Sequence, residues 1–550
     1  MGNDIDRRTF LGVVGAGVAA NSALGKNALG IQANREETDT MPKNKPNVLF
    51  IMTDQQRYDS IAALGNPDIY SPNFDRLVRR GATFRQAYSS CPVCVPARYN
   101  IRTGREPHTT AVYQNGPANL VDGQPEAMED RCGAYLARTM RNLGYRTFGI
   151  GKFHTHPQWN EDLGYDVHLH TEELYGTAEV RSQDAYAGYI EREHPCYDFI
   201  EGLHGERTEM YYIPQMSPMP AEHTVEGWVA KRAVEQIKKS YSRPYFGFIS
   251  FIGPHPPLAP PIPFNRLYDP DRMPNPVRGD IKIDHMDEQI TWMNHLIWAD
   301  DINDYLARVL RSRYYGELTY IDHCIGLILD AVEASGENDN TLICFFSDHG
   351  EHLGDHAAWQ KESFFEVSAK VPFLLSWPAK IPENIIREDL VSLTDLFGIA
   401  TTAAGTQELR DGTDVLGAIA GVAPSRDYLF GLYGTPGTRQ FKIMVRHEAW
   451  KYIFFANGNQ AQLFNLEEDP KELTQLLDAH PEMAEKLHAV AVDYCRRINL
   501  ERALDGDDFR DLPFEARPLF RIHQFARSRG VTGFPEHPRD VLDQWEFNGL

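Results

Sequence analysis

Apolar runs alternate along the chain with segments whose apolar positions recur every three or four residues. The run from Asn47 to Met52 is almost wholly apolar, which is typical of a strand buried on both faces of a sheet. A helix is expected to begin at Pro72, with Ser71 as its N-cap, and to end at Gly81. Further strands are predicted at 146–150, 245–251 and 341–346, and further helices at 128–143, 225–237 and 314–329. This alternation predicts an α/β fold.

The pattern changes after about Ser425, where short strands joined by turns replace the long alternation. Strands are predicted at 441–446, 452–456 and 462–466, with Asn457 and Gly458 as a two-residue turn. An amphipathic helix is predicted at 481–498. We therefore expect a large α/β domain at 46–424 and a smaller β-rich C-terminal subdomain at 425–550, preceded by a signal and linker at 1–45.

Paired arginines stand near the N-terminus. Arg7 and Arg8 precede a short stretch of small and apolar residues at 12–20, which is typical of a twin-arginine export signal. We expect a periplasmic or secreted protein. No apolar run in the sequence is long enough to span a bilayer, so the chain is not expected to cross a membrane.

The charge balance limits the possible partners. The 550 residues include 55 basic and 77 acidic side chains, a formal net charge of −22, which argues against a nucleic-acid-binding surface. An anionic substrate must therefore meet a local basic pocket. The seven cysteines are an odd number without the spacing of a disulfide framework, so most are expected to be buried thiols.

Polar residues follow several of the predicted strands directly. Asp54 follows the first strand, Lys152 and His154 the second, His255 the third, and Asp348 with His349 the fourth. Open α/β sheets place their sites at the carboxyl ends of strands, so these side chains are expected to meet. An aspartate at a strand end is often only a turn or helix cap. Acid-containing pairs after two separate strands favour a binding site.

Cys94 opens the motif that carries the chemistry, C-V-P-A-R-Y-N-I-R-T-G-R. Pro96 favours a helix start, which places Cys94 at a helix N-terminus where amide donors and the helix dipole favour an anion. Spacing alone leaves three interpretations open: a reactive thiolate, an anion site, or a buried cysteine before a helix.

The pattern C-x-P-x-R followed by T-G-R resembles the signature of type I sulfatases, members of the alkaline phosphatase superfamily in which the cysteine is converted to formylglycine. The resemblance extends from Pro46 to about Ile498 and includes, in the family's order, Gly151-Lys152-Phe153-His154, Pro254-His255-Pro256-Pro257 and the segment from Ser347 to Lys361. It implies an alkaline-phosphatase-like fold with a large mixed sheet flanked by helices.

The resemblance also implies roles for individual residues. Hydrated formylglycine at position 94 would attack sulfur, and one divalent metal would be held by position 94 together with Asp54, Gln55, Asp348 and His349. Calcium is the implied ion. Many relatives have Asp in place of Gln55 and Asn in place of His349, so Mg²⁺ and Mn²⁺ stay open.

The same resemblance implies a cationic pocket and two proton carriers. Arg98 would hold the hydroxyls of the modified residue, Lys152 and Lys361 would bind sulfate oxygens, His255 would protonate the leaving alcohol, and His154 would trigger sulfate release. A formylglycine-generating enzyme is the implied maturation partner. The aromatic and charged region 155–221, including Tyr175, Arg181, Tyr186, Tyr189, Arg207, Tyr211 and Tyr212, is either part of the pocket mouth or an elaborated surface loop.

The predicted function is hydrolysis of sulfate esters, with a sulfated carbohydrate as the leading substrate class. Two alternatives stay open: a phosphonate or phosphate monoester hydrolase of the same superfamily, and a non-catalytic protein that binds sulfated glycans. The G-K-F-H element at 151–154 favours the sulfatase over the phosphonate branch.

Overall fold

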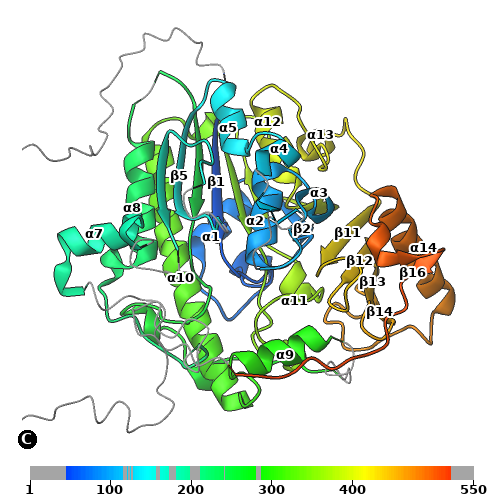
Figure 1. Cartoon of the computed structure of the whole chain (residues 1–550). Coiled ribbons are helices and arrows are strands. Elements are labelled where there is room, and N and C mark those ends of the chain that lie inside the picture. Colours follow the sequence, from blue (N-terminus) through cyan, green and yellow to red (C-terminus); the bar gives the residue numbers. More distant parts are fainter. Residues whose placement is uncertain are drawn as a thin grey trace, which may run out of the picture. The chain divides into compact units, whose positions relative to one another are not determined.

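A computed structural model describes residues 45–115, 120–121, 124–125, 128–155, 161–172, 181–197, 211–240, 242–279 and 287–521 (Figure 1). Residues from Met41 onward form one compact unit. The predicted export signal lies outside the described residues. In the part of the chain that the structure describes, no helix is both long and apolar enough to cross a membrane.

An eight-stranded sheet is the centre of the fold, in the order β10-β2-β9-β8-β1-β7-β5-β6. Its strands are β1 (Asn47–Thr53), β2 (Ala82–Tyr88), β5 (Arg146–Lys152), β6 (Val167–Thr171), β7 (Tyr245–Ser250), β8 (Thr341–Ser347), β9 (Phe373–Ser376) and β10 (Ile385–Ser392). Only β9 runs antiparallel to its neighbours in this sheet, so the sheet is mixed. The predicted fold class is confirmed.

Alternating residues of β1 supply the two cores that cover the sheet. Leu49 and Ile51 pack with α1 (Pro72–Arg79), α8 (Val225–Ile237) and α10 (Asp304–Ala334) on one face. Val48, Phe50 and Met52 pack with α2 (Cys94–Thr103), α5 (Leu136–Asn142) and α12 (Asp395–Ala403) on the other. Both faces are buried because successive side chains of a strand point to opposite sides. The continuous apolar run in the sequence has this origin.

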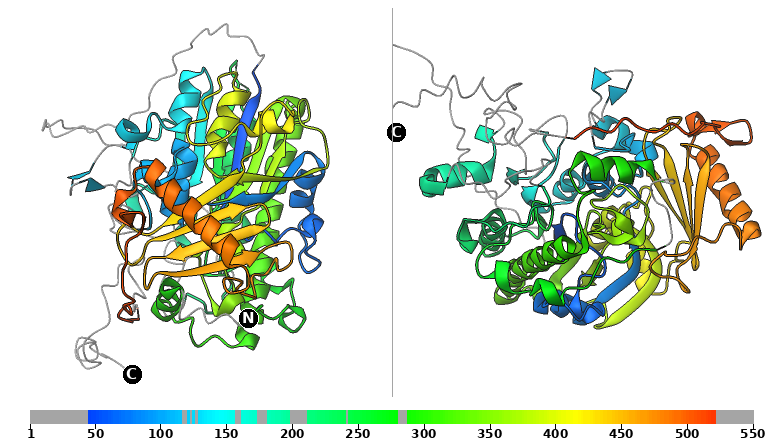
Figure 2. Two further views of the ribbon diagram at one scale, coloured as in Figure 1. Left: turned by 90° about the vertical axis from the view of Figure 1, so that its right-hand side faces the viewer. Right: turned by 90° about the horizontal axis from the view of Figure 1, so that it is seen from below.

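A second, antiparallel sheet follows, with the order β11-β12-β13-β14. Its strands are β11 (Tyr428–Tyr433), β12 (Lys442–His447), β13 (Trp450–Phe455) and β14 (Gln460–Asn465), and α14 (Pro481–Arg497) crosses one face, as Figure 2 shows. Ile443 and Val445 face α14, whereas Met444 faces the main body through Phe364 and Phe365. The predicted β-rich C-terminal region is confirmed, and β11 is an additional strand.

Two helix predictions need correction. The single helix expected at 128–143 is two helices, α4 (Met128–Cys132) and α5, because Gly133 has φ +82° and ends the first. The Glu129 carboxylate accepts the Tyr135 N–H at 2.8 Å and so satisfies a backbone donor at the start of α5.

Helix α1 begins after Ser71 as predicted, but the Ser71 side chain does not cap it. Asp322 on α10 instead accepts the N–H groups of Asn73 and Phe74, at 3.0 and 2.7 Å. Thr224 does cap α8, because its hydroxyl accepts the Gly227 N–H at 3.3 Å. All seven cysteines are free thiols, and only Cys196 is exposed.

Candidate active site

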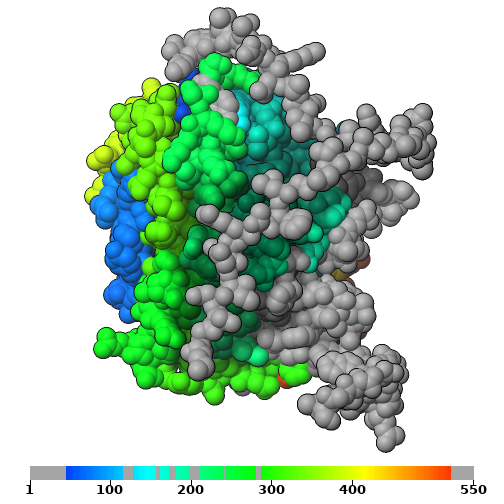
Figure 3. All heavy atoms as spheres, turned by 90° about the vertical axis from the view of Figure 1, so that its left-hand side faces the viewer, coloured from blue at the N-terminus to red at the C-terminus, as the bar shows by residue number. Residues whose placement is uncertain are grey.

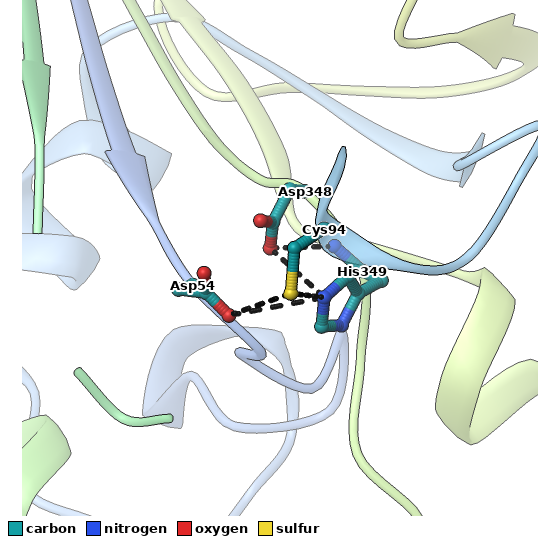
Figure 4. Close-up of side chains that lie close together, drawn as sticks. All are labelled: Asp54, Cys94, Asp348 and His349. Atoms are coloured by element: carbon teal, nitrogen blue, oxygen red, sulfur yellow. Dashed lines mark hydrogen bonds and ion pairs between the residues drawn. The ribbon is translucent and has the colours of Figure 1, made fainter. Parts of the chain in front are cut away.

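Strands β1 and β8 bring two acidic positions together. They are parallel neighbours in register, with Thr53 opposite Ser347, so Asp54 and Asp348 leave the same edge of the sheet side by side. Ligand atoms of Asp54, Cys94, Asp348 and His349 lie within 4.8 Å of one another (Figure 4). All four side chains are fully buried. The structure therefore brings together four of the five residues implied as metal ligands.

Helix α2 presents Cys94 to this cluster from its first turn. The Cys94 Sγ lies 3.2 Å from His349 Nε2 and 3.9 Å from Asp54 Oδ1. The helix ends at Gly104, whose φ of +63° suits glycine and whose Cα packs against the ring of Phe397. This tight packing leaves α2 buried along its whole length, so the position of Cys94 is set by the core.

Arg98 joins the two carboxylates one helical turn after Cys94. Its Nη2 lies 2.8 Å from Asp54 Oδ2 and its Nε 3.0 Å from Asp348 Oδ2. Its Nη1 donates to the Lys152 carbonyl at 2.6 Å and to Ser250 Oγ at 3.0 Å. The guanidinium thus links the ends of β1, β5, β7 and β8.

The electrostatics of the cluster are strongly coupled. Burial alone would raise the pKa of the Cys94 thiol, but Lys361, Lys152 and His349 lower it well below its usual range. Burial and the repulsion of Asp54 raise the pKa of Asp348 to about 6. Asp54 itself keeps a lowered pKa despite burial, because Lys152, His255 and Arg98 face it. A site that stabilises anions on this scale is suited to a negatively charged substrate.

Gln55 occupies a different environment from the other four residues implied as metal ligands. Its backbone is left-handed, with φ +67°, and its N–H donates to Asp348 Oδ1 at 3.1 Å. The amide oxygen accepts Lys361 Nζ at 2.6 Å, and the amide nitrogen donates to Glu351. The side chain therefore bridges Lys361 and Glu351 in this structure.

Glu351 lies in the segment from Ser347 to Lys361, and the sequence gives it no catalytic role, but the structure places it in the site. Its carboxylate accepts the Tyr212 hydroxyl at 2.9 Å and the N–H groups of Leu353 and Gln360 at 2.9 and 2.7 Å, besides the Gln55 amide. It is fully buried, so burial raises its pKa. Its position two residues after His349 was the available signal.

The two candidate proton carriers also converge on Cys94. Both imidazole rings, of His154 and of His255, form a hydrogen bond with its thiol. His255 Nδ1 lies 2.7 Å from the Pro256 carbonyl, so Nδ1 carries the proton and Nε2 faces the site. Burial, Lys361 and Lys152 lower the pKa of His255 to about 4. The ring is therefore neutral in the free site at neutral pH.

His154 stands in a left-handed conformation, with φ +51°, just after β5. Its backbone N–H donates to Glu172, which also accepts His170 Nε2 at 2.6 Å. A left-handed non-glycine residue is costly and requires such fixed partners. Glu172 and His170 lie at the end of β6, and the sequence reasoning did not single them out.

Four tyrosines from the described part of the region 155–221 lie in two environments. Tyr212 lies in the site beside Glu351, and Tyr211 OH lies 3.5 Å from His255 Nε2. Tyr186 and Tyr189 pack with the core over α8. Tyr175 and Arg207 lie outside the described residues.

The fold is alkaline-phosphatase-like, and the site is a buried cluster of two acids, cationic side chains and one cysteine. The sulfatase family model matches residues 46–406, and the chain therefore belongs to the sulfatase family and is a sulfuric ester hydrolase. A second model, the C-terminal domain of N-sulphoglucosamine sulphohydrolase, matches residues 354–493.

Relatives of similar sequence agree with this assignment, and a solved structure shares the fold. An arylsulfatase of Clostridium perfringens is 28% identical over 481 residues, covering 84% of this chain and 95% of that protein. Human iduronate 2-sulfatase is 28% identical over 404 residues, covering 68% and 67% respectively. The crystal structure of a phosphonate monoester hydrolase of Agrobacterium radiobacter is similar with a TM-score of 0.69 and 23% identity, covering 83% of this chain and 96% of that one.

Proposed function

We propose that the chain removes sulfate from a sulfated carbohydrate, using formylglycine made from Cys94 and one divalent cation. The observation that carries the proposal is the convergence of Cys94 with two carboxylates, His349, Arg98, Lys152 and Lys361 in one buried cluster. Formylglycine, when present, supplies a hydrated aldehyde whose hydroxyl acts as the nucleophile.

The cationic side chains answer the need for a local basic pocket in a chain of net charge −22. Lys361 Nζ has three N–H donors and, among the described residues, one hydrogen-bond acceptor, Gln55 Oε1 at 2.6 Å. Lys152 Nζ lies 2.6 Å from Asp54 Oδ2. Both amines are buried near Cys94, where a low dielectric strengthens their attraction for a sulfate oxygen.

The donor set fits a divalent cation. Two carboxylates and one imidazole surround position 94, and a cation between Asp54 and Asp348 would relieve the repulsion that raises the pKa of Asp348. Calcium is the ion proposed, with Mg²⁺ and Mn²⁺ as alternatives because an imidazole is an unusual calcium ligand. When bound, the cation would supply positive charge beside the nucleophile and the sulfate oxygens.

Protons would be carried by the two histidines that touch the thiol. His255 would donate its Nε2 proton to the bridging oxygen as the sulfur–oxygen bond breaks, and His154 would accept the proton whose loss releases sulfate. The two lysines that lower the pKa of His255 are those that a bound sulfate would neutralise. Substrate binding would therefore raise that pKa and favour the acid form.

A carbohydrate substrate is supported by the names of relatives. Human iduronate 2-sulfatase and the N-sulphoglucosamine sulphohydrolase C-terminal model are both named for sugar substrates. The export signal expected at residues 1–45 is consistent with action on a polymer outside the cytoplasm.

The test has two parts. The chain is produced with a formylglycine-generating enzyme, and the peptide containing Cys94 is examined by mass spectrometry for the aldehyde. Turnover is then compared on defined sulfated saccharides, aryl sulfates, and phosphate and phosphonate monoesters, before and after chelation and with Ca²⁺, Mg²⁺ or Mn²⁺ restored. Activity confined to small aryl or alkyl sulfates contradicts the carbohydrate proposal. An unmodified thiol without turnover favours a non-catalytic glycan binder.

A phosphonate or phosphate monoester hydrolase is the second candidate. The observation in its favour is the likeness to the phosphonate monoester hydrolase of Agrobacterium radiobacter, at TM-score 0.69. A higher kcat/KM on phosphonate than on sulfate monoesters in the panel would establish it.

We also propose twin-arginine export to the periplasm or the cell exterior. Because the twin-arginine route carries folded proteins and Cys94 has no exposed surface in the folded chain, oxidation of Cys94 must precede folding in the cytoplasm. Replacing Arg7 and Arg8 by Lys should retain the protein inside the cell with formylglycine already formed. Normal export of that variant would contradict the proposed route.

A further inference from the structure

Two buried acids, Glu226 and Glu317, meet beneath the segment that carries His255, defined here as residues 253–259. Glu226 lies in the first turn of α8 and Glu317 in the middle of α10. These two helices form much of the surface in Figure 3, and both carboxyl groups lie on their covered side, with side chains at least nine-tenths buried.

The two acids bond the two ends of the same segment. Glu226 Oε1 accepts the Gly253 N–H at 3.1 Å, and Glu317 accepts the N–H of Ala259. Gly253 is close to both carboxyl groups, since a Cβ at that position would lie 2.7 Å from Glu317 Oε1 and 3.4 Å from Glu226 Oε1. The segment is thus held at both ends by the helices below it.

Neither acid has a cationic partner among the described residues. Oε2 of Glu317 is buried and, in the described part of the chain, has no hydrogen-bond partner. Burial raises the pKa of Glu226 to about 7, and burial with the proximity of Glu226 raises that of Glu317 further from its usual range. Burial without a cation favours the protonated form of both acids, and burying such polar groups is costly.

The position of the segment fixes the position of the His255 ring. His255 Nδ1 is bonded to the carbonyl of Pro256, inside the segment, at 2.7 Å. The segment is also tied to the site, because the Asp54 N–H donates to the Gly253 carbonyl at 3.3 Å. A shift of the segment therefore moves Nε2 relative to the bridging oxygen of the substrate.

We propose that Glu226 and Glu317 are positioning residues that hold His255 where it protonates the leaving alcohol. This rests on the proposed function of His255. In the step concerned, the bridging oxygen keeps the electron pair of the breaking sulfur–oxygen bond and takes the Nε2 proton. A misplacement of about 1 Å in such a transfer costs on the order of 10²-fold in rate.

The experiment uses a series of sulfate esters, from nitrophenyl sulfate to unsubstituted phenyl sulfate and an alkyl sulfate, with the matured, metal-loaded enzyme. Loss of acid assistance slows esters of poor leaving groups most. His255→Ala is measured first and sets the reference. If the loss of rate in His255→Ala does not grow as the leaving group worsens, His255 is not the general acid. The positioning proposal then fails because its premise fails, and not because of the glutamates.

Glu226→Ala and Glu317→Ala are then expected to show the same dependence on the leaving group. Their rates should fall by roughly 10- to 100-fold for the alkyl ester and by under about threefold for nitrophenyl sulfate. Glu226→Gln and Glu317→Gln keep an acceptor for the same N–H groups and should restore most of the activity. If the alanine variants do not fold, Glu226→Asp and Glu317→Asp, which shorten the reach by one methylene, take their place.

Asp322→Ala is the matched control. Asp322 lies on α10, is buried, and accepts two backbone N–H groups, but those of α1 rather than of the His255 segment. It should lower stability without changing the dependence on the leaving group. Equal losses on every ester at Glu226 and Glu317, as for Asp322, or no loss at all, would overturn the proposal.

Discussion

Two buried lysines, Lys361 in the site and Lys451 between the two sheets, show how the chain uses charge in different ways. Lys451 Nζ donates to the Phe364 carbonyl at 2.7 Å and to Glu366 at 2.9 Å, and it also contacts Glu472. It therefore has two hydrogen-bond acceptors and a second carboxylate as an ion-pair partner. Lys361 Nζ has one hydrogen-bond acceptor within the described residues. Both side chains are almost fully buried.

The difference separates structural from chemical use of a buried charge. Around Lys451 the acids and the amine satisfy one another, so the cluster fixes the C-terminal sheet and offers nothing to a ligand. Around Cys94, Lys361 keeps N–H donors that the proposed function assigns to a sulfate. Burial alone does not identify a site; the difference here lies in how far the neighbouring groups satisfy the buried amine.

The largest expected effect is at the centre of the site cluster. Cys94→Ala removes the precursor of the nucleophile, so turnover of sulfate esters should fall by at least about 10⁴-fold with little change in stability. Initial rates and a thermal melt of the same preparation measure both. A variant that retained more than a few per cent of the rate would show that Cys94 is not the nucleophile position.

Lys451→Met tests the structural cluster. It leaves Glu472 buried without its cation and leaves Glu366 with Lys370 at 3.1 Å, so the free energy of unfolding should fall by about 3–5 kcal/mol. The remaining folded enzyme should keep its kcat. Because protonation of Glu472 removes its unpaired buried charge, the deficit should shrink at acid pH. Urea titration at several pH values measures this, and a deficit that does not vary with pH would argue against the assigned ion pairs.

Lys361→Met is the matched change in the site. The rate should fall about 10²-fold, which corresponds to about 2.7 kcal/mol of transition-state stabilisation, while stability changes by less than about 1 kcal/mol. The kinetic and unfolding measurements are made side by side with Lys451→Met. If both lysine variants lose stability and neither loses rate, the distinction between the clusters is wrong.

The smallest expected effect is on the pH dependence of stability, and it concerns Glu226, which pairs with Glu317 rather than with a lysine. The pKa of Glu226 rises from 4.5 to about 7 in the folded chain, so the folded state holds this proton more tightly than the unfolded state. Its contribution is complete below the unfolded pKa and is lost as pH rises towards 7, by on the order of 1 kcal/mol per pH unit.

Glu226→Gln should flatten that decline. Melting temperatures between pH 4.5 and 8 test this, because the melting temperature of the variant relative to that of the wild type should rise with pH. Asp322→Asn provides the comparison, because burial raises the pKa of Asp322 to about 6 and its effect should therefore be complete at a lower pH. Parallel curves for Glu226→Gln and wild type would show that Glu226 does not change its proton there.

Much of the fold could be predicted because it depends on short stretches of sequence. The strands β1, β7 and β8 are continuous apolar runs, and Thr224 caps α8 within three residues. Where a partner lies far along the chain, prediction failed or was incomplete. The cap of α1 comes from Asp322, some 250 residues away, and the break between α4 and α5 depends on a single glycine conformation.

In the candidate site, too, local features could be predicted and long-range partners could not. Cys94, Asp54, Asp348 and His255 were singled out from motifs and strand ends, and the structure places them together. Glu172, Glu226 and Glu317 were not, because a glutamate among 77 acidic residues has no local mark. Their importance arises only from the backbone groups that they meet after folding.

The sequence by itself determined the types of residue available and their order: a cysteine before a helix, acids after two strands, and histidines after two more. Periodicity is local, so these features survive without a structure. The tertiary structure alone decided which charges are left with unfilled donors and which are satisfied. That distinction depends on distances between residues hundreds of positions apart, and it separates Lys361 from Lys451.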